Sequence, residues 1–245
     1  MSGHAADPLA AGDDRSLMAL RADCGFTYDA RGRMLRTNEP CAVARRPAPR
    51  LFLGGTRPGV VVRYGATLPE QVVEALAEAI GRHAVAGDAA PPPALTAAVR
   101  SVLGRHAPVT AETAGLAYRF PTALPRPGDV VRLTVANRSL ARDTFPWLHD
   151  EIADWQPCFA AVADGRAVSV CFSARLDAAA AEAGLETLPA HRRRGHGAAV
   201  TAAWAAAVRA AGRIPLYSTG WDNVASQGVA RHLGLVQFGA DATWA

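Results

Sequence analysis

The sequence contains no lysine: its 26 basic residues are all arginine and stand against 22 acidic residues, for a net charge of +4. This absence excludes a P-loop, because that phosphate-binding motif requires a lysine. A net charge this small, spread along the chain, argues against a nucleic-acid partner. Since arginine replaces lysine everywhere, the excess of arginine indicates a GC-rich coding genome and by itself points to no ligand.

Cysteines and long apolar segments are also scarce. Cys24, Cys41, Cys158 and Cys171 form no C-x-x-C pair, so we expect no metal site and reduced thiols. The longest apolar run near the C-terminus, 198–208, is far shorter than the about 20 residues of a membrane span. The start of the chain has no signal-peptide pattern. We therefore expect a soluble cytoplasmic protein without a membrane partner.

The 245 residues divide best near residue 125, within a proline-rich stretch. Residues 1–125 form an N-terminal α+β region of unknown role, in which 1–12 are expected to be disordered. Apolar periodicity predicts strands and then helices in this region, at 51–53, 60–62, 69–80 and 94–104, with a linker at 87–93.

Residues 126–245 read as a second unit with a different pattern. A strand at 130–135 and a helix at 143–155 precede two apolar runs, 158–162 and 167–172, which Asp164-Gly165 joins as a hairpin. The remaining predicted elements are a strand, a helix, a strand and a helix, at 184–188, 198–211, 215–219 and 224–233. Strand, helix and strand at this spacing form a βαβ crossover, so the two strands should be parallel neighbours.

The segment HRRRGHGAAV, residues 191–200, places three arginines and two glycines where a helix is about to start. A helix N-terminus offers unpaired N–H groups at the positive end of its dipole, and glycine lets an anion approach the backbone. This pattern predicts a phosphate or pyrophosphate site. A dinucleotide fingerprint fails because Val200 takes its last glycine or alanine position. The alternative is a solvated basic turn whose glycine allows close packing.

Arg192-x-x-Gly195-x-Gly197 resembles the Q/R-x-x-G-x-G/A pyrophosphate loop of the GNAT (GCN5-related N-acetyltransferase) superfamily. The resemblance extends upstream over 185–189 and downstream over 221–226 and the Leu-Gly-Leu of 233–235. It covers about 143–238 of the chain. It implies an α+β fold: a GNAT-like mixed sheet with a central parallel βαβ unit flanked by helices, in addition to the N-terminal α+β region.

The resemblance implies acetyl-CoA as co-substrate and assigns residues to it. The loop would hold the pyrophosphate through Arg192, Arg193, Arg194, Gly195, His196, Gly197 and Ala198. Thr187 and Leu188, on a strand that splays from its parallel neighbour, would contact the pantetheine. Asn223 and Ser226 would flank the thioester, although Asn223 also fits a helix N-cap.

Acyl transfer to an amine needs a base, an oxyanion donor and an acid for the thiolate. Glu186 is the best base, because its strand should be mostly buried; an ion pair with an arginine is the alternative, and Glu182 is second choice. The family often has a tyrosine acid seven residues after the asparagine, where this chain has Ala230. Tyr217 and Ser218 are the expected substitutes, and His232 should lie on a helix surface.

The sequence therefore predicts an acetyl-CoA-dependent N-acyltransferase acting on an amine of a small molecule or peptide. The alternatives are a non-catalytic acyl-CoA-binding or regulatory module and, third, a protein that binds RNA or peptide through the arginine loop. Few residues follow Gly234 to form the strands that close the sheet. We expect one of three arrangements: a very short pair of strands at 236–238 and 242–244, completion of the sheet by the N-terminal region, or completion by a second subunit in a homodimer. We expect the residues before Pro125 to pack against the C-terminal core.

Overall fold

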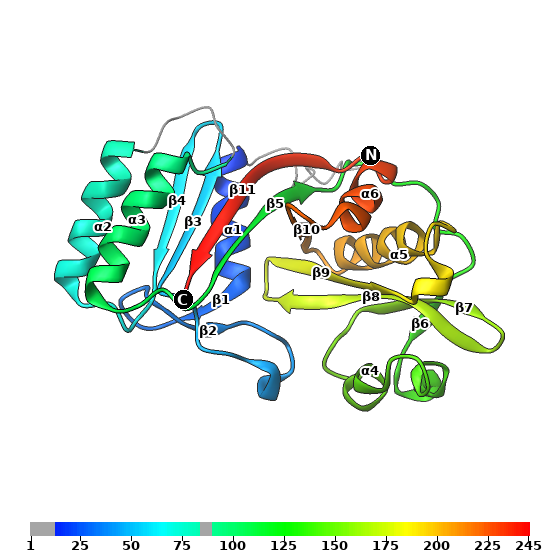
Figure 1. Ribbon diagram of the computed structural model, residues 1–245. Coiled ribbons are helices and arrows are strands. Elements are labelled where there is room, and N and C mark those ends of the chain that lie inside the picture. The colour runs from blue at the N-terminus through cyan, green and yellow to red at the C-terminus, as the bar shows by residue number, and fades with distance from the viewer. Residues whose placement is uncertain (1–12, 84–89) are drawn as a thin grey trace, which may run out of the picture.

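The computed structural model describes residues 13–83 and 90–245, so the expectations for 1–12 and for 87–89 of the linker lie outside the described residues. A nine-stranded mixed sheet runs through the molecule in the order β4-β3-β11-β5-β10-β9-β8-β7-β6 (Figure 1). The strands are β1 (Phe26–Tyr28), β2 (Met34–Thr37), β3 (Leu51–Thr56), β4 (Gly59–Tyr64), β5 (Glu112–Arg119), β6 (Val131–Leu133), β7 (Cys158–Ala163), β8 (Arg166–Leu176), β9 (Ala180–Thr187), β10 (Ile214–Gly220) and β11 (Val236–Trp244). The helices are α1 (Asp14–Gly25), α2 (Glu70–His83), α3 (Pro93–His106), α4 (Pro146–Glu151), α5 (His196–Ala210) and α6 (Val224–His232).

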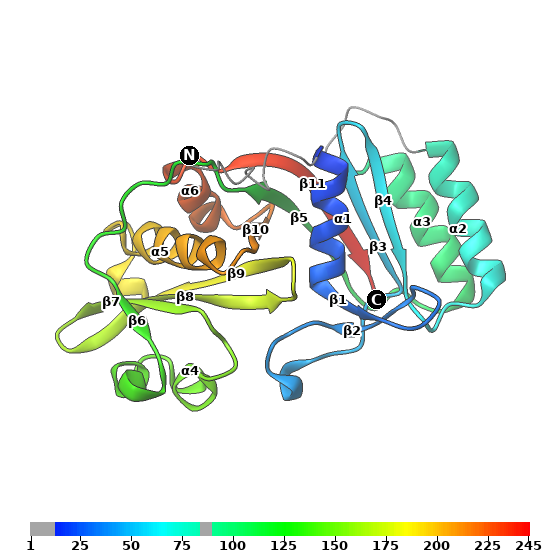
Figure 2. The same ribbon diagram turned by 180° about the vertical axis from the view of Figure 1, so that it is seen from behind.

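Helices cover both faces of the sheet. On β3, Leu51 and Leu53 pack with α2 and α3, whereas Phe52 packs with α1 on the opposite face. Further along the sheet, α5 packs with Tyr217 and Val168 on one face, and α4 lies in the core cluster of the other face. Figures 1 and 2 show α1 on the opposite face of β3 and β11 from α2 and α3. Side chains that alternate between the two faces of a strand therefore join different core clusters, one on each face of the sheet.

Helix α1 was not predicted from the sequence. Asp13 caps it, since its Oδ1 accepts the Ser16 N–H at 2.8 Å. Its Met18 lies against glycines of the sheet: a Cβ on Gly239 would be 2.6 Å from Met18 Cε, and one on Gly54 would also overlap the Met18 side chain. Glycine at these strand positions lets the helix approach the sheet closely.

The N-terminal region completes the C-terminal half of the sheet. β11 is one continuous strand with a register shift between Gln237 and Gly239, not a short pair, and it lies between β3 and β5. β5, another element that the sequence patterns did not predict, also pairs with β10. The expected packing of the N-terminal residues against the C-terminal core is confirmed. The division near residue 125 stays a prediction, and strands from both sides of it share one sheet.

Most other predicted elements are present with shifted ends. The strand expected over 130–135 is shorter, because Thr134 caps a 3-10 helix over Val135–Ala141. The helix expected over 143–155 is only α4, which begins at Pro146, a residue suited to a helix start. The predicted parallel pairing of β9 and β10 is confirmed.

Candidate functional site

The parallel strands β9 and β10 separate partway along their length. Their register pairs Ile214 with Ala180, Pro215 with Ala181 and Leu216 with Glu182, and the pairing ends there. Both strands nevertheless continue, β9 to Thr187 and β10 to Gly220. Beyond the last pair, each strand stays paired on its outer side, β9 with β8 and β10 with β5. The backbone groups on the two inner edges, which would otherwise pair with each other, face an opening.

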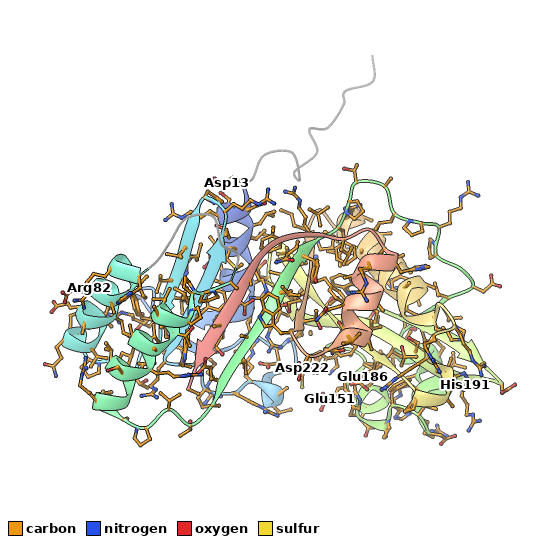
Figure 3. The ribbon with its side chains drawn as sticks, turned by 45° about the horizontal axis from the view of Figure 1, so that its top comes forward. Asp13, Arg82, Glu151, Glu186, His191 and Asp222 are labelled. Carbon is orange, nitrogen blue, oxygen red and sulfur yellow. The ribbon has the colours of Figure 1, made fainter. Side chains whose placement is uncertain are left out.

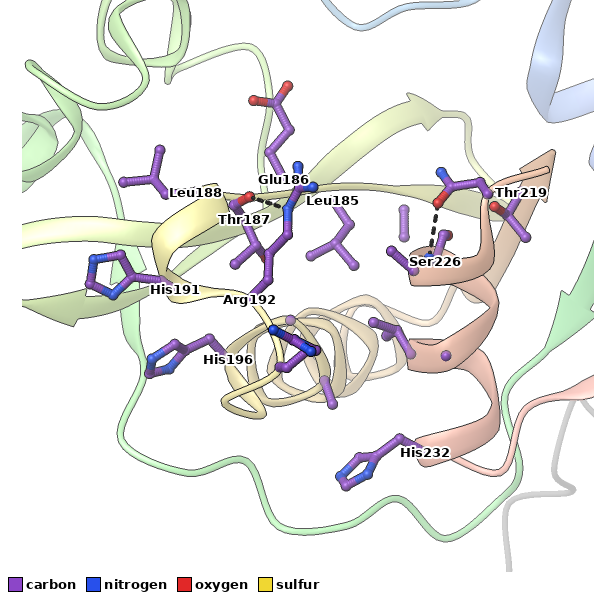
Figure 4. A pocket seen from close by; sticks show the side chains of 18 of the residues that line it. Leu185, Glu186, Thr187, Leu188, His191, Arg192, His196, Thr219, Ser226 and His232 are labelled. Carbon is purple, nitrogen blue, oxygen red and sulfur yellow. Dashed lines mark hydrogen bonds between the residues drawn. The ribbon is translucent and has the colours of Figure 1, made fainter.

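A cleft of 1270 Å³ occupies this opening (Figure 4). Residues of β9, the arginine loop, the start of α5, β10 and α6 line it. The structure therefore brings together nearly all of the predicted ligand-binding residues: Thr187, Leu188, Arg192, Arg193, Gly195, His196, Gly197, Ala198, Asn223 and Ser226. Arg194 is the exception, because it is exposed and does not line the cleft.

The arginine loop presents a helix N-terminus to the cleft. Gly195 caps α5 with φ 82°, and Arg193 also has a positive φ of 60°. The Ala199 N–H donates to the Gly195 carbonyl at 3.0 Å, so the N–H groups of the two preceding residues have no acceptor within the helix. The Arg192 Nε donates to the Thr187 carbonyl at 3.2 Å and holds the arginine across the end of β9. These groups form an electropositive site.

Gly197 lies where α5, α6 and β9 meet. A Cβ placed on it would be 3.4 Å from Val229 Cγ2, 3.5 Å from Thr187 Oγ1 and 3.6 Å from Leu185 Cδ2. These are ordinary contact distances, so a single methyl group fits but a larger side chain would extend toward the cleft. The glycine therefore serves close packing as well as an open loop.

Three buried polar atoms among the cleft residues have no hydrogen-bond partner within the described structure: Thr144 Oγ1, His191 Nδ1 and Thr219 Oγ1. Thr219 as a whole is only 8% exposed. An unsatisfied buried polar group is costly, and a polar ligand in the cleft would supply the missing partners. Sequence reasoning missed Thr219; the signal was its place two residues after Tyr217, on the same side of β10.

A hydroxyl pair lies at the α6 end of the cleft. The Tyr217 Oη is 2.6 Å from Ser226 Oγ, and burial raises the pKa of Tyr217 to about 12. Asn223 is the N-cap of α6, because its Oδ1 accepts the Ser226 N–H at 3.0 Å. The N-cap interpretation of Asn223 is thus confirmed, while Asn223 also lines the cleft.

Glu186 lies at the far end of β9 on the cleft wall. The expectation that it is buried is wrong: the residue is exposed, because β9 has already left β10 at this point. Figure 4 shows its carboxylate pointing away from α5. Partial burial still raises the pKa of Glu186, and a hydrogen bond with the Trp147 side chain offsets part of this effect. No ion pair involves Glu186 within residues 13–83 and 90–245, so the arginine-pair alternative finds no support.

The other expected residues lie as follows. Ala230 is buried in the α5 core and provides no acid, and His232 is exposed on α6, as predicted. Ser218 lines the cleft and donates a hydrogen bond to Glu182, which is buried and paired with Arg21. Glu186 and His191 both lie in the half of the molecule away from Arg82 on α2 (Figure 3).

The described part of the chain contains no group of three or more His, Cys, Asp or Glu side chains arranged to hold a metal ion. None of its helices has both the length and the apolar character needed to cross a membrane.

The chain resembles known proteins in its C-terminal part and in its fold. The family described as FR47-like protein matches residues 172–244, from the end of β8 to β11. No curated protein matches the chain in sequence.

Solved structures extend the fold comparison. A GNAT-family acetyltransferase from Colwellia psychrerythraea has a TM-score of 0.50 and 13% identity, over 76% of this chain and 80% of that one. A GCN5-related N-acetyltransferase-like protein from Streptococcus suis has a TM-score of 0.48 and 15% identity, over 82% and 85%. A GNAT-family protein from Novosphingobium aromaticivorans has a TM-score of 0.44 and 23% identity, over 56% of this chain and only 65% of that one.

The family match, together with the fold shared with the Colwellia protein, confirms the resemblance to the GNAT superfamily. The α+β fold class with a GNAT-like mixed sheet is confirmed as well.

Proposed function

We propose that this protein is an N-acyltransferase that moves an acetyl group from acetyl-CoA to an amine of a small molecule or peptide. The observation that carries the proposal is the separation of β9 from β10 after the Leu216–Glu182 pair, with an electropositive helix N-terminus at one end of the opening. An elongated ligand with an anionic end fits this combination. The four cysteines are free and buried, in keeping with a reducing cytoplasm.

The residues of the cleft suit acetyl-CoA in three places. The N–H groups of Gly197 and Ala198, with Arg192 and Arg193, would hold the pyrophosphate. The edge of β9 that leaves β10 would bind the amides of the pantetheine arm at Thr187, as strands bind extended chains. Leu188 would contact the arm through its side chain, because its N–H and carbonyl already bond to Val168 and His191. The unpartnered Thr219 hydroxyl would gain its missing hydrogen bond in the same channel.

Chemistry would take place between the strands. Glu186 would accept the proton of the attacking amine, since its raised pKa makes it a stronger base than an ordinary glutamate. Tyr217 would protonate the leaving thiolate, because its pKa of about 12 keeps its hydroxyl proton in place at neutral pH. Asn223 and Ser226 would flank the thioester end.

The test compares two substitutions at one glycine. Gly197→Ala should bind CoA within about threefold of the parent, because its methyl group fits at ordinary contact distance. Gly197→Val should bind CoA about 10- to 100-fold more weakly, which corresponds to the loss of one or two hydrogen bonds to a charged group. Calorimetric titration with CoA measures both, and circular dichroism checks folding.

Unchanged CoA affinity in a folded Gly197→Val protein would contradict the assignment of the loop. Release of free thiol from acetyl-CoA with a panel of amines then separates the acyltransferase from a non-catalytic acyl-CoA-binding module. Binding without transfer to any amine would support the module.

A further inference from the structure

An aromatic cluster lies on the face of the sheet that α4 covers. It consists of Trp147 of α4, Trp155 just after that helix, and Phe172 of β8, none of which lines the cleft. The ring centroids of the two tryptophans are 5.8 Å apart, and that of Phe172 is 5.0 Å from Trp147 and 5.5 Å from Trp155. All three pairs meet edge to face, an arrangement that aromatic rings prefer. Each ring is therefore held in place by the other two.

The cluster also rests on the strand that carries Glu186. A Cβ on Gly184 of β9 would lie only 2.4 Å from Phe172 Cε2, so the ring lies directly on this strand. Gly184 pairs with Phe172 of β8, and Glu186 pairs with Val170 in the same ladder. Directly paired residues of antiparallel strands point to the same face, and Val170 and Phe172 both belong to the core cluster that contains α4. The Glu186 side chain therefore points to the α4 face of the sheet.

The Trp147 indole meets this carboxylate. The indole has a single polar group, an N–H donor, and the Glu186 carboxylate accepts a hydrogen bond from the Trp147 side chain. Trp147 is half-buried and its ring is fixed by the cluster, whereas Glu186 is exposed and lies near the end of its strand. The tryptophan is thus the rigid partner. Since a carboxylate has two oxygens, one can be held by the N–H while the other stays open to a ligand.

Charged groups lie around Glu186 on two sides. On α4 and just after β9 they are His149, Asp150, Glu151, His191 and Arg192. The first two pair with each other at 2.7 Å, Glu151 accepts the Trp155 N–H at 2.9 Å, and Arg192 donates to a backbone carbonyl. The influences on the pKa of Glu186 are burial, which raises it, and the Trp147 hydrogen bond, which lowers it. Trp147 is therefore the side chain that bears directly on this carboxylate.

We infer that Trp147 is a positioning residue for acyl transfer: its indole N–H holds one oxygen of the Glu186 carboxylate and leaves the other aimed at the acceptor amine. The inference rests on the proposed function. In that reaction the amine nitrogen bonds to the thioester carbon and its proton passes to the open oxygen of Glu186. The C–S bond breaks, and the thiolate takes a proton from Tyr217. Trp147 exchanges no proton; it restricts the rotamers of an exposed glutamate to the productive one.

The main variant of the full-length protein is Trp147→Phe, which keeps a ring in the cluster and removes the N–H. Loss of this hydrogen bond should raise the pKa of Glu186, because the bond stabilises the ionised form. Carbon-13 NMR of the glutamate carboxyl groups measures this pKa in the free protein, and Glu186→Gln identifies the resonance. This measurement needs neither acetyl-CoA nor an acceptor.

Turnover is then measured by thiol release from acetyl-CoA with a panel of amines that begins with benzylamine and tyramine. On the alkaline side of the acidic limb, where Glu186 is ionised in both proteins, Trp147→Phe should lower kcat about three- to tenfold, the value of one hydrogen bond. The acidic limb itself should move to higher pH. The KM for acetyl-CoA should stay within about twofold, because Trp147 does not line the cleft.

Trp155→Phe is the matched control. It makes the same substitution in the same cluster but removes an N–H that is bonded to Glu151. It should lower stability, while the pKa of Glu186 and the acidic limb stay as in the parent. In a Glu186→Gln background, Trp147→Phe should have no further effect on kcat, because it acts through that carboxylate. If Trp147→Phe does not fold, Trp147→Met fills the space without an N–H and carries the same expectations.

An unchanged pKa of Glu186 in folded Trp147→Phe would overturn the inference and leave the proposed function standing. A raised pKa with a kcat equal to or above the parent's on the alkaline side would also overturn it, because the tryptophan would then tune the base without positioning it. A parent protein that binds CoA but acetylates no amine of the panel would overturn the acyl transfer and this inference together.

Discussion

The two ends of the cleft are built in different ways. At the anion end, one continuous segment, 192–198, supplies backbone N–H groups, glycines and arginines. At the other end, Tyr217, Ser218 and Ser226 come from β10 and α6, and Arg21 of α1 pairs with Glu182, which accepts the Ser218 hydroxyl. Glu186 lies nearer the anion end, beside Thr187 on β9 (Figure 4). The first end depends on backbone conformation, whereas the second depends on individual side chains. Substitutions at the two ends should therefore separate binding of CoA from turnover.

The largest expected effect is on turnover, from Glu186→Gln. If Glu186 is the base, the substitution lowers kcat by about 10²- to 10⁴-fold while CoA affinity stays within about twofold. In the parent, activity should be lost as the pH falls through the pKa of Glu186, which partial burial raises from the ordinary value of a glutamate. Steady-state rates between pH 5 and 9 and calorimetry with CoA measure the two quantities.

The acidic limb of the pH profile is the decisive feature for Glu186. It should disappear in Glu186→Gln, because glutamine does not titrate. A variant that keeps both the parent's rate and the parent's acidic limb would show that another group removes the proton.

A smaller effect on turnover is expected from Tyr217→Phe. Loss of the hydroxyl, which lies 2.6 Å from Ser226 Oγ, should lower kcat about 10- to 100-fold and leave CoA affinity nearly unchanged. Because the pKa of Tyr217 is about 12, its proton is retained throughout the alkaline range used in assays. The parent should therefore show no alkaline loss of activity from this residue below pH 10. A loss there that survives in Tyr217→Phe would assign the acid to another group.

The same contrast explains what the sequence could predict. The anion end was predictable because its residues are contiguous, and a glycine-arginine loop before a helix has one simple physical meaning. The parallel βαβ unit followed from apolar periodicity and spacing. The separation of β9 from β10 was expected from the resemblance, and the register pairs confirm that their pairing ends at Leu216.

The remainder depends on contacts between distant segments. Helix α1 has mixed polarity and a weak apolar stripe, so periodicity did not identify it, and its Arg21 meets Glu182 only in the folded protein. β5 has the sequence ETAGLAYR, and its first three residues are exposed. It therefore has no long apolar run, and its place between β10 and β11 was not predicted. The exposure of Glu186 depends on where two strands part, a property of the sheet rather than of the residues around it.

The smallest expected effect separates backbone strain from ligand binding at the anion end. Gly195 has φ 82°, and a Cβ added to it would meet no other atom. Gly195→Ala is therefore destabilising only because alanine disfavours the left-handed backbone conformation. This should cost about 1–2 kcal/mol of stability and lower the Tm by several degrees.

Gly212 is the matched control, because it has φ 74°, equally open space, and a place after the other end of α5. Gly212→Ala should lower the Tm about as much, as measured by thermal unfolding, but leave CoA affinity unchanged. Gly195→Ala should also weaken CoA binding a few-fold, because a relaxed cap turns the N–H groups of the first helical turn away from the anion. Equal CoA affinity in the two variants would mean that the Gly195 conformation serves only the fold, and that the anion end depends on its arginines instead.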